Sequence, residues 1–338
     1  MDKMVQGNLS NQLLLCYNYR EDDPARASSE AYRLFNGYYE GLPGLVIDRY
    51  AKTILISNHS RQPESLATQI DQVVQISISE LKWIESILLK TRHSKDLEER
   101  KGRLLFGQNL PQEFTEDGVR YAIDLRLNQD DSFYLDTRNL RSWLQQNSKG
   151  LRVLNFFAYT GSLGVAALAG AAAEVLQTDS NSGFLAVAER SRQLNDLPET
   201  MRLWKSDYFK AIASLKKNKA LFDIVILDAP FFSESRHGKV DLQKEQVKLV
   251  NKARPLVAHG GKLILINNAL YVSGKQVISE ISELGRSGHI SLEQTVDIPQ
   301  DVTGYPTTIR NQPPADPAPF NHPTKISILQ VTRKDQAR

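Results

Sequence analysis

The sequence predicts an α/β protein with a mostly parallel, seven-stranded sheet and a smaller α+β domain before it. Two observations predict this fold class. From Leu151 onward, short apolar runs alternate with longer amphipathic stretches, which is the pattern of strands and helices around a parallel sheet. Before Thr91 the pattern differs, because the expected order is strand, strand, helix, strand. The 338 residues, of which 41% are hydrophobic, suffice for about two domains with cores of their own.

The first domain is expected to contain two helices, over residues 9–20 and 64–80, the second because its apolar positions recur at helical spacing. Its expected strands, bounded by turn-forming residues, are Leu45–Asp48, Thr53–Ser57 and Trp83–Leu89, and the short apolar stretch Tyr32–Phe35 precedes them. From Thr91 to Gly118 both charge signs mix with Gly and Pro without any period, which is typical of a mobile loop or a domain boundary. We therefore divide the chain into domains 1–118 and 119–338.

The second domain follows a strand-then-helix rhythm. Its seven expected strands are Arg152–Phe157, Glu174–Thr178, Met201–Trp204, Phe222–Leu227, Lys262–Ile266, Ser291–Asp297 and Ile326–Thr332. Its five expected helices are Leu163–Ala172, Gly183–Leu194, Tyr208–Lys216, Asp241–Val257 and Lys275–Leu284. The segment Val153–Ala173 is uncharged and nearly as long as a membrane span, but its glycines and polar residues predict a buried strand, a glycine turn and a helix. The Pro-rich segment Gln312–Pro323 is expected to form an ordered lid or rim loop.

Composition excludes several classes of protein. Lys and Arg outnumber Asp and Glu by only 42 to 39, so bulk charge does not indicate a nucleic-acid partner. The one cysteine, Cys16, excludes a disulfide framework, a Cys-rich zinc site and a dithiol redox motif. No pair of His or Cys has metal-ligand spacing, and we expect no metal. The N-terminus lacks the apolar run of a secretion signal, so we expect a cytoplasmic protein that does not enter a membrane.

A glycine turn follows the first strand of the second domain. Gly161 and Gly164, in the segment Asn155–Gly164, would let a ligand approach the backbone at a helix N-terminus, as in nucleotide-binding cradles. Asp179, at the end of the next strand, could accept hydrogen bonds from both hydroxyls of a ribose. The G-x-x-G spacing favours S-adenosylmethionine over NAD without excluding NAD, and a simple glycine turn stays open.

The fourth strand of this domain runs into Asp228-Ala229-Pro230-Phe231-Phe232. Ligands of open α/β sheets bind at this carboxyl edge. Asp228 could accept a hydrogen bond from a nucleobase, Pro230 would fix the backbone, and Phe231 could stack on the base. A turn whose two phenylalanines cap the core is the alternative. The segment looks like the D/N-P-P-F/Y motif of nucleobase methyltransferases, with Ala229 in place of the first proline, which weakens the case for an exocyclic amine as acceptor.

Four segments are similar, in the same order, to segments of the large-subunit ribosomal RNA methyltransferase family, whose members are cytosine-C5 and guanine-N7 enzymes. They are Gly41–Tyr50, Phe133–Arg138, Asn155–Gly164 and Asp228–Phe231. The resemblance implies a class I methyltransferase fold with a Rossmann-like sheet, S-adenosyl-L-methionine as cofactor, and 23S ribosomal RNA as partner. It also implies an RNA-positioning role for domain 1–118. The family's N-terminal PUA module is not expected, because the segment before Tyr32 is too short for one.

The resemblance also implies site residues. Those expected to bind the cofactor are Tyr134, Asp136, Arg138, Asn155, Ala158, Tyr159, Thr160, Gly161, Ser162, Asp179, Ser180, Asp207, Tyr208 and Asp228. Those expected to act on the target base are Asp228, Pro230, Phe231 and Asn267. For Asp207, a helix cap before Tyr208 is nearly as consistent with the sequence. Arg138 and Arg141 would share one helical face as phosphate contacts, with a solvated surface position as the alternative.

Within the family, the residues favour guanine N7 over cytosine C5. Methylation at C5 needs a thiolate that adds to C6, and the only thiol lies in the remote N-terminal segment. Asn267-Asn268 follows the fifth strand, where the cytosine enzymes carry a Ser-Cys-Ser run, and it resembles the N7 branch, as does Tyr159–Ser162. Guanine N7 offers a lone pair, so alignment would supply most of the rate, and Asn267 or Asn268 would donate to O6. Strand-end hydrogen bonding of this Asn pair is the alternative.

Three other functions stay open from the sequence. They are a cytosine-C5 or exocyclic-amine RNA methyltransferase, an NAD-dependent oxidoreductase, and a module that binds cofactor or RNA without catalysis. The sequence also leaves the oligomeric state open, with a homodimer as one option.

Overall fold

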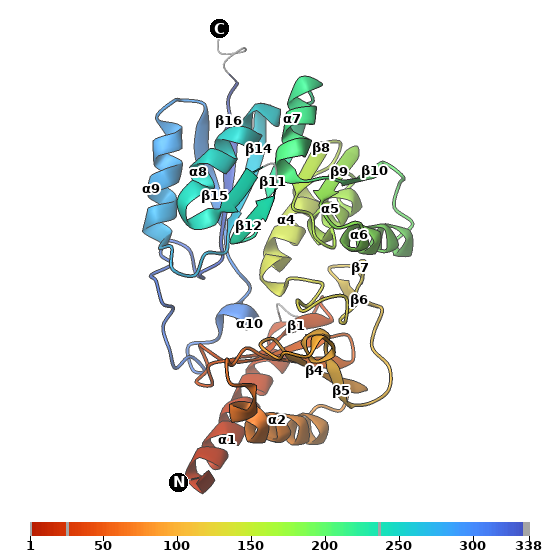
Figure 1. Cartoon of the computed structure of the whole chain (residues 1–338), viewed down its shortest axis with the longest axis vertical. Coiled ribbons are helices and arrows are strands. Elements are labelled where there is room, and N and C mark those ends of the chain that lie inside the picture. The colour runs from red at the N-terminus through yellow and green to blue at the C-terminus, as the bar shows by residue number, and fades with distance from the viewer. Residues whose placement is uncertain (1, 25–26, 236–237, 334–338) are drawn as a thin grey trace. The chain divides into compact units, whose positions relative to one another are not determined.

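The computed structural model describes residues 2–24, 27–235 and 238–333, and the chain folds into two compact units (Figure 1). The first unit comprises Met1–Leu135 and Pro299–Gln312, and the second comprises Asp136–Ile298 and Pro313–Arg338. The division expected from the sequence places the join after Gly118. The units differ from it because the first unit continues to Leu135, and because a segment from far along the chain returns to it.

The first unit is built on a five-stranded sheet in the order β1-β2-β3-β4-β5. Its strands are β1 (Ala31–Asn36), β2 (Leu45–Tyr50), β3 (Thr53–Asn58), β4 (Ser86–Thr91) and β5 (Arg103–Phe106). Neighbours are antiparallel, except that β3 and β4 run parallel. Two helices, α1 (Asp2–Glu21) and α2 (Ala67–Glu80), contact each other and contribute apolar residues to one core with the sheet. The expected helices and strands before Thr91 are therefore confirmed.

The interpretation of Thr91–Gly118 as a mobile loop is wrong. This stretch contains the short helix α3 (Leu97–Lys101), strand β5, and strand β6 (Glu113–Glu116), which pairs with β7 (Val119–Ala122). The four residues of β5 are all exposed or partly exposed, because β5 is an edge strand of the sheet. A short edge strand needs no buried face, so it leaves no alternation of apolar and polar residues to detect.

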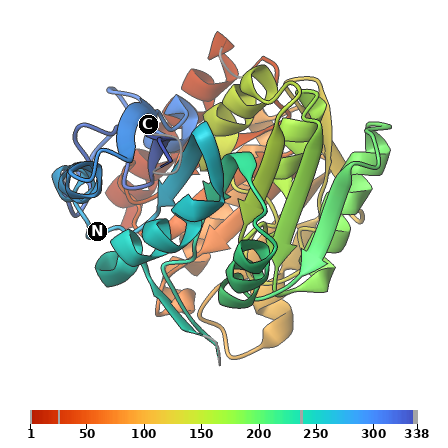
Figure 2. The same ribbon diagram turned by 90° about the horizontal axis from the view of Figure 1, so that it is seen from above.

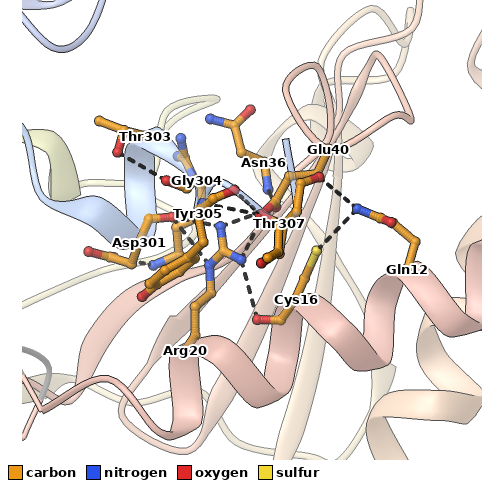
Figure 3. A network of polar contacts seen from close by, with 12 residues as sticks. Gln12, Cys16, Arg20, Asn36, Glu40, Asp301, Thr303, Gly304, Tyr305 and Thr307 are labelled. Atoms are coloured by element: carbon orange, nitrogen blue, oxygen red, sulfur yellow. Dashed lines mark hydrogen bonds and ion pairs between the residues drawn. The ribbon is translucent and has the colours of Figure 1, made fainter. Parts of the chain in front are cut away.

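The returning segment Pro299–Gln312, which contains the helical turn α10 (Gln300–Thr303), is held by a buried ion pair of the first unit (Figure 3). The side chains of Arg20 and Glu40 are both 0% exposed and form two hydrogen bonds, of 2.9 and 3.1 Å. Arg20 also donates to the backbone carbonyl of Asp301, and Thr308 donates to Glu40. The buried pair therefore binds residues of the returning segment through both of its charges.

Arg20 and Glu40 compensate each other's charge inside the core of the first unit. Removing one partner of a buried pair leaves the other without a counter-charge, which typically costs about 3–5 kcal/mol. We therefore expect Arg20→Met to lower the free energy of unfolding by about this amount, measured by urea unfolding followed by circular dichroism. Lys52→Met is the control, because it breaks the exposed pair Lys52–Glu85 and should cost at most about 1 kcal/mol. Equal, small losses in both variants would contradict the account.

The second unit contains a seven-stranded sheet in the order β10-β9-β8-β11-β14-β16-β15. Its strands are β8 (Arg152–Phe156), β9 (Glu174–Asp179), β10 (Met201–Lys205), β11 (Phe222–Leu227), β14 (Val257–Asn267), β15 (Ile290–Val296) and β16 (Lys325–Val331). The first five run parallel, and β16 is antiparallel to both of its neighbours. Its long helices, which lie on both sides of the sheet (Figure 2), are α4 (Arg138–Asn147), α5 (Ser162–Ala169), α6 (Ser182–Leu194), α7 (Tyr208–Lys217), α8 (Leu242–Ala253) and α9 (Gly274–Gly285).

All seven strands and five helices expected in this half of the chain are present, so the predicted fold class is confirmed. The segment Val153–Ala173 forms a strand, a turn and a helix, and none of the helices that the structure describes is long and apolar enough to cross a membrane. The sequence did not predict the hairpin of β12 (Phe232–Ser235) and β13 (Gly238–Asp241).

The Pro-rich loop is fixed to the second unit by both side-chain and backbone contacts. Phe320 is buried, and the side-chain amide of Asn321 both donates to the Ile298 carbonyl and accepts from the Ile298 amide. The N–H of Gly274 donates to the carbonyl of Asp316. The expectation of an ordered loop therefore holds, whereas a lid function stays a prediction.

Candidate functional site

The polar residues predicted from the sequence gather at one edge of the second unit's sheet. Strands β8, β9, β10, β11 and β14 run parallel, so their carboxyl ends meet at the same edge. Each strand ends in, or is followed within three residues by, a residue that the sequence singled out. These residues are Tyr159, Asp179, Asp207, Asp228 and Asn268. This is the edge at which open α/β sheets bind their ligands.

Asp179 connects the turn after β8 to the turn after β9. Its two carboxylate oxygens accept hydrogen bonds of 2.9 Å from the backbone N–H groups of Tyr159 and Asn181. Burial raises the pKa of this carboxyl, and the hydrogen bonds from the backbone act in the opposite direction. The Ser180 N–H also bonds to this carboxylate. A carboxylate has about four acceptor sites, so it can still accept a hydroxyl group of a ligand.

The turn between β8 and α5 has a strained backbone. Phe157, Tyr159 and Gly161 all have positive φ angles, of 55°, 52° and 78°. The Ala158 N–H donates to the Thr178 carbonyl at 2.9 Å. Left-handed conformations cost non-glycine residues roughly 1–2 kcal/mol each, so the turn keeps this shape only because its hydrogen bonds hold it.

The two glycines of this turn serve packing inside the unit. A Cβ atom on Gly161 would lie 2.3 Å from the Cβ of Ala188, and one on Gly164 would lie 2.4 Å from the side chain of Gln177. The sequence assigned both glycines to ligand approach. Their missing side chains allow α5 to lie against α6 and β9, and the approach of a ligand to this turn stays a prediction.

The remaining predicted residues of the turn differ in their accessibility. Asn155 is buried, and its side-chain amide N–H donates to the side-chain oxygen of Gln177 at 3.0 Å. The side-chain oxygen of Asn155 has no hydrogen-bond partner. Ala158 and Thr160 are also buried, whereas Tyr159 and Ser162 are partly exposed and Ser180 is exposed. Only the partly exposed and exposed members present side chains to solvent at this edge.

Asp207 and Tyr208 follow β10. Asp207 caps helix α7, because one of its carboxylate oxygens accepts from the N–H groups of Phe209 and Lys210. The alternative of a helix cap before Tyr208 is therefore confirmed. The other carboxylate oxygen of Asp207 takes no part in the cap. Tyr208 was expected to bind the cofactor, but its ring is buried and stacks on Phe157. Its hydroxyl donates to the Leu249 carbonyl at 2.9 Å. Tyr208 is therefore a core residue.

A pair of carboxylates comes together at the end of β11. Asp228 is partly exposed, and its pKa is raised to about 7, first by burial and then by the negative charge of Asp136. Asp136 precedes α4 and accepts a hydrogen bond of 2.9 Å from the hydroxyl of Thr324, which precedes β16. The structure thus brings together two predicted residues and one, Thr324, that the sequence did not single out.

The other residues of the motif after β11 differ in how far they are exposed. Ala229 is fully buried, and Pro230 is partly exposed. Phe231 and Phe232 are 46% and 52% exposed, so they do not cap the core. The rings are therefore accessible to a flat partner.

Asn267 does not occupy the position expected for a base contact. It is buried, donates to Gln246 of α8, and accepts from the N–H of Ala269. The alternative of strand-end hydrogen bonding describes it correctly, whereas the neighbouring Asn268 is exposed.

The two arginines predicted as phosphate contacts are buried. Arg138 is 6% exposed and Arg141 is 1% exposed, and Arg141 donates to the Thr137 hydroxyl at 2.7 Å. Arg141 therefore cannot serve as a phosphate contact in this conformation. Tyr134 is 44% exposed and belongs to the first unit. Among the described residues, no cluster of three or more His, Cys, Asp or Glu side chains could hold a metal ion.

Sequence reasoning missed Lys325, the first residue of β16. Its side chain is buried, and its ammonium donates to the carbonyls of Ala269 and Pro323. Burial lowers its pKa to about 8. A lysine at the start of an apolar strand carries no signal that separates it from an exposed one.

The raised pKa of Asp228 has a consequence for stability. Because the folded-state pKa of about 7 exceeds the ordinary value of 3.8, the folded state loses stability as pH rises between these values. Asp228→Asn removes the charge, so its thermal midpoint should exceed that of the wild type increasingly from about pH 4 to pH 7 and level off above. Calorimetry at several pH values tests this, and a constant difference between the two proteins would contradict it.

The chain resembles known proteins over most of its length. Residues 39–303 match the family described as S-adenosylmethionine-dependent methyltransferase. The ribosomal RNA large subunit methyltransferase I of Aeromonas hydrophila is 31% identical over 293 residues, which are 83% of this chain and 73% of that protein. Its counterpart in Aeromonas salmonicida is 30% identical, over 86% and 76% of the two chains.

Solved structures agree with this assignment at the level of the fold. The crystal structure of SMU.776 complexed with SAH has a TM-score of 0.84 at 21% identity, covering 96% of this chain and 82% of that one. The SAM-dependent methyltransferase from Agrobacterium tumefaciens has a TM-score of 0.63 at 17% identity, covering 90% and 91%. The family match argues against the NAD-dependent oxidoreductase that the sequence left open. The chain belongs to the S-adenosylmethionine-dependent methyltransferase family, and S-adenosylmethionine is its cofactor.

Proposed function

We propose that this enzyme methylates a base of large-subunit ribosomal RNA, at N7 of guanine. The names of its relatives, ribosomal RNA large subunit methyltransferase I, support ribosomal RNA as the substrate. The cytoplasm, where this RNA is found, is part of the same proposal. So is a role for the first unit in positioning structured RNA by shape and phosphate contacts.

The observation that carries the choice of atom is the position of the only thiol. Methylation of cytosine at C5 requires a thiolate that adds to the base. Cys16, the one cysteine of the chain, is 0% exposed in the core of the first unit, and burial raises its pKa. A buried, protonated thiol cannot add to a nucleobase. Guanine N7 needs no such adduct, because it already carries a lone pair.

The acidic edge fits S-adenosylmethionine. When bound, this cofactor supplies a methyl group on a positively charged sulfonium. Asp179 would accept from the ribose through its remaining acceptor capacity, and Asp207 would accept from the adenine amino group through its uncapped oxygen. Asp136 and Asp228 add negative charge at the same edge, which suits a cationic ligand.

The neighbouring residues would hold the target base. Phe231 offers an exposed ring for stacking, and Pro230 fixes the backbone that carries it. Asp228 would accept from a base N–H when ionised, and the exposed Asn268 would donate to O6 of guanine. Because N7 loses no proton on methylation, these residues have to align the base rather than remove a proton from it.

One observation favours an exocyclic amine as a second candidate acceptor. An amine must lose a proton during methylation, and a carboxylate with a pKa of about 7, such as Asp228, suits a general base. The buried Ala229, in place of the motif's first proline, weakens this candidate.

Mapping the product tests the proposal. Purified enzyme, tritiated S-adenosylmethionine and transcribed 23S ribosomal RNA should give label in 7-methylguanosine, recognised by borohydride reduction and aniline cleavage of the RNA. Cys16→Ala should methylate at the wild-type rate, because its thiol takes no part. Label in 5-methylcytidine, or loss of activity in a folded Cys16→Ala variant, would contradict guanine N7. Label in an exocyclic N-methyl nucleoside would establish the second candidate instead.

A further inference from the structure

A tight turn after β14 exposes two large apolar side chains. In the turn Ala269–Val272, the N–H of Val272 donates to the carbonyl of Ala269 at 3.2 Å. The two ends of the turn are buried in the core of the second unit. The two central residues, Leu270 and Tyr271, are 53% and 72% exposed. An exposed pair of this kind on a well-anchored turn indicates a binding surface.

Buried polar groups fix the base of this turn. The Ala269 N–H donates to the side chain of Asn267 at 2.9 Å, and the Ala269 carbonyl also accepts from the Lys325 ammonium at 3.0 Å. Asn267 and Lys325 are each 1% exposed. Tyr271 therefore projects from a rigid support, so binding a partner through it costs little conformational entropy.

The turn lies beside the aromatic motif described above. β11 and β14 are adjacent parallel strands, with Leu227 paired to Leu265, so the segments that follow them emerge at one edge. The segment after β11 carries the exposed Phe231 and Phe232, and the Lys239 ammonium lies 4.9 Å from the centre of the Phe232 ring. The Lys239 ammonium also pairs with the Asp241 carboxylate at 3.7 Å. This edge therefore offers accessible rings, on which bases of a single-stranded nucleic acid can stack.

We propose that Tyr271 stacks on a nucleotide next to the target base of the RNA. The inference rests on the proposed function and extends it from the methylated base to its neighbour. A strand whose target base reaches Asp228 and Phe231 must pass along this edge, where Tyr271 offers a flat ring. Asn267 and Lys325 act as positioning residues, because they hold the turn and do not face the RNA.

Fluorescence anisotropy of the full-length chain with fluorescein-labelled oligoadenylate and oligouridylate tests the inference. Tyr271→Ala should weaken binding roughly five- to a hundredfold, the range of base–aromatic stacking. Tyr271→Trp should restore it, because stacking needs a ring and not a hydroxyl. Leu292→Ala is the matched control, since it shortens another exposed apolar residue of the second unit and should bind as the wild type does.

Each other outcome overturns the inference. Wild-type binding with unchanged affinity in Tyr271→Ala would remove Tyr271 from the RNA surface. If Tyr271→Ala instead dissociated a dimer in light scattering without altering RNA binding, the turn would be an interface between two copies of the chain. If the wild type bound neither oligonucleotide nor 23S ribosomal RNA, the proposed function itself would fail, and Tyr271 would have no RNA to contact.

Discussion

The architecture of the carboxyl edge of the second unit's sheet depends on the Asp179 carboxylate. Its two oxygens hold the N–H groups of Tyr159 and Asn181, and so connect the turns after two adjacent strands. The turn after β8 contains two non-glycine residues in left-handed conformations, each unfavourable by roughly 1–2 kcal/mol. The hydrogen bond from the Tyr159 N–H to the Asp179 carboxylate contributes about 1.5–3 kcal/mol, and the one from the Ala158 N–H to the Thr178 carbonyl about 0.5–1.5 kcal/mol, so together they are comparable to that strain. One side chain therefore sets the shape of the surface on which the cofactor is expected to lie.

The same edge keeps two ionisable groups in unfavourable surroundings. Burial raises the pKa of Asp228 and lowers that of Lys325, so each is shifted toward its neutral form. Neither shift helps the folded protein at neutral pH, which is typical of residues retained for function. In the proposed function, Asp228 accepts a hydrogen bond from the RNA base. Lys325 holds the neighbouring turn by donating to two backbone carbonyls. The first unit differs, because its buried Arg20 and Glu40 neutralise each other.

The sequence was most informative where local patterns decide structure. The apolar runs predicted every strand of the second unit's sheet. They also placed Asp179 and Asp228 at its carboxyl edge, where their contacts with a ligand stay a prediction. Its predictions were wrong for Tyr208 and Asn267, because their partners, Leu249 and Gln246, lie on another element. Whether an asparagine at a strand end faces solvent or a helix is decided by tertiary packing, and no local pattern records it.

Long-range polar contacts account for the other difference. The segment Pro299–Gln312 belongs to the first unit because Arg20 binds Asp301, a residue 281 positions away along the chain. Sequence periodicity describes neighbours within one helix or strand, so it cannot show that a segment late in the chain packs against the first unit. The short strand β5 was missed for a related reason, since its exposed residues follow no period.

Titration calorimetry with S-adenosylmethionine tests most directly whether Asp179 organises the cofactor surface. We expect Asp179→Ala to lose at least an order of magnitude in affinity, because both the turn and the ribose contact depend on this carboxylate. Glu174→Ala, at the opposite end of the same strand, should bind as the wild type does. A folded Asp179→Ala variant with unchanged affinity would contradict the account.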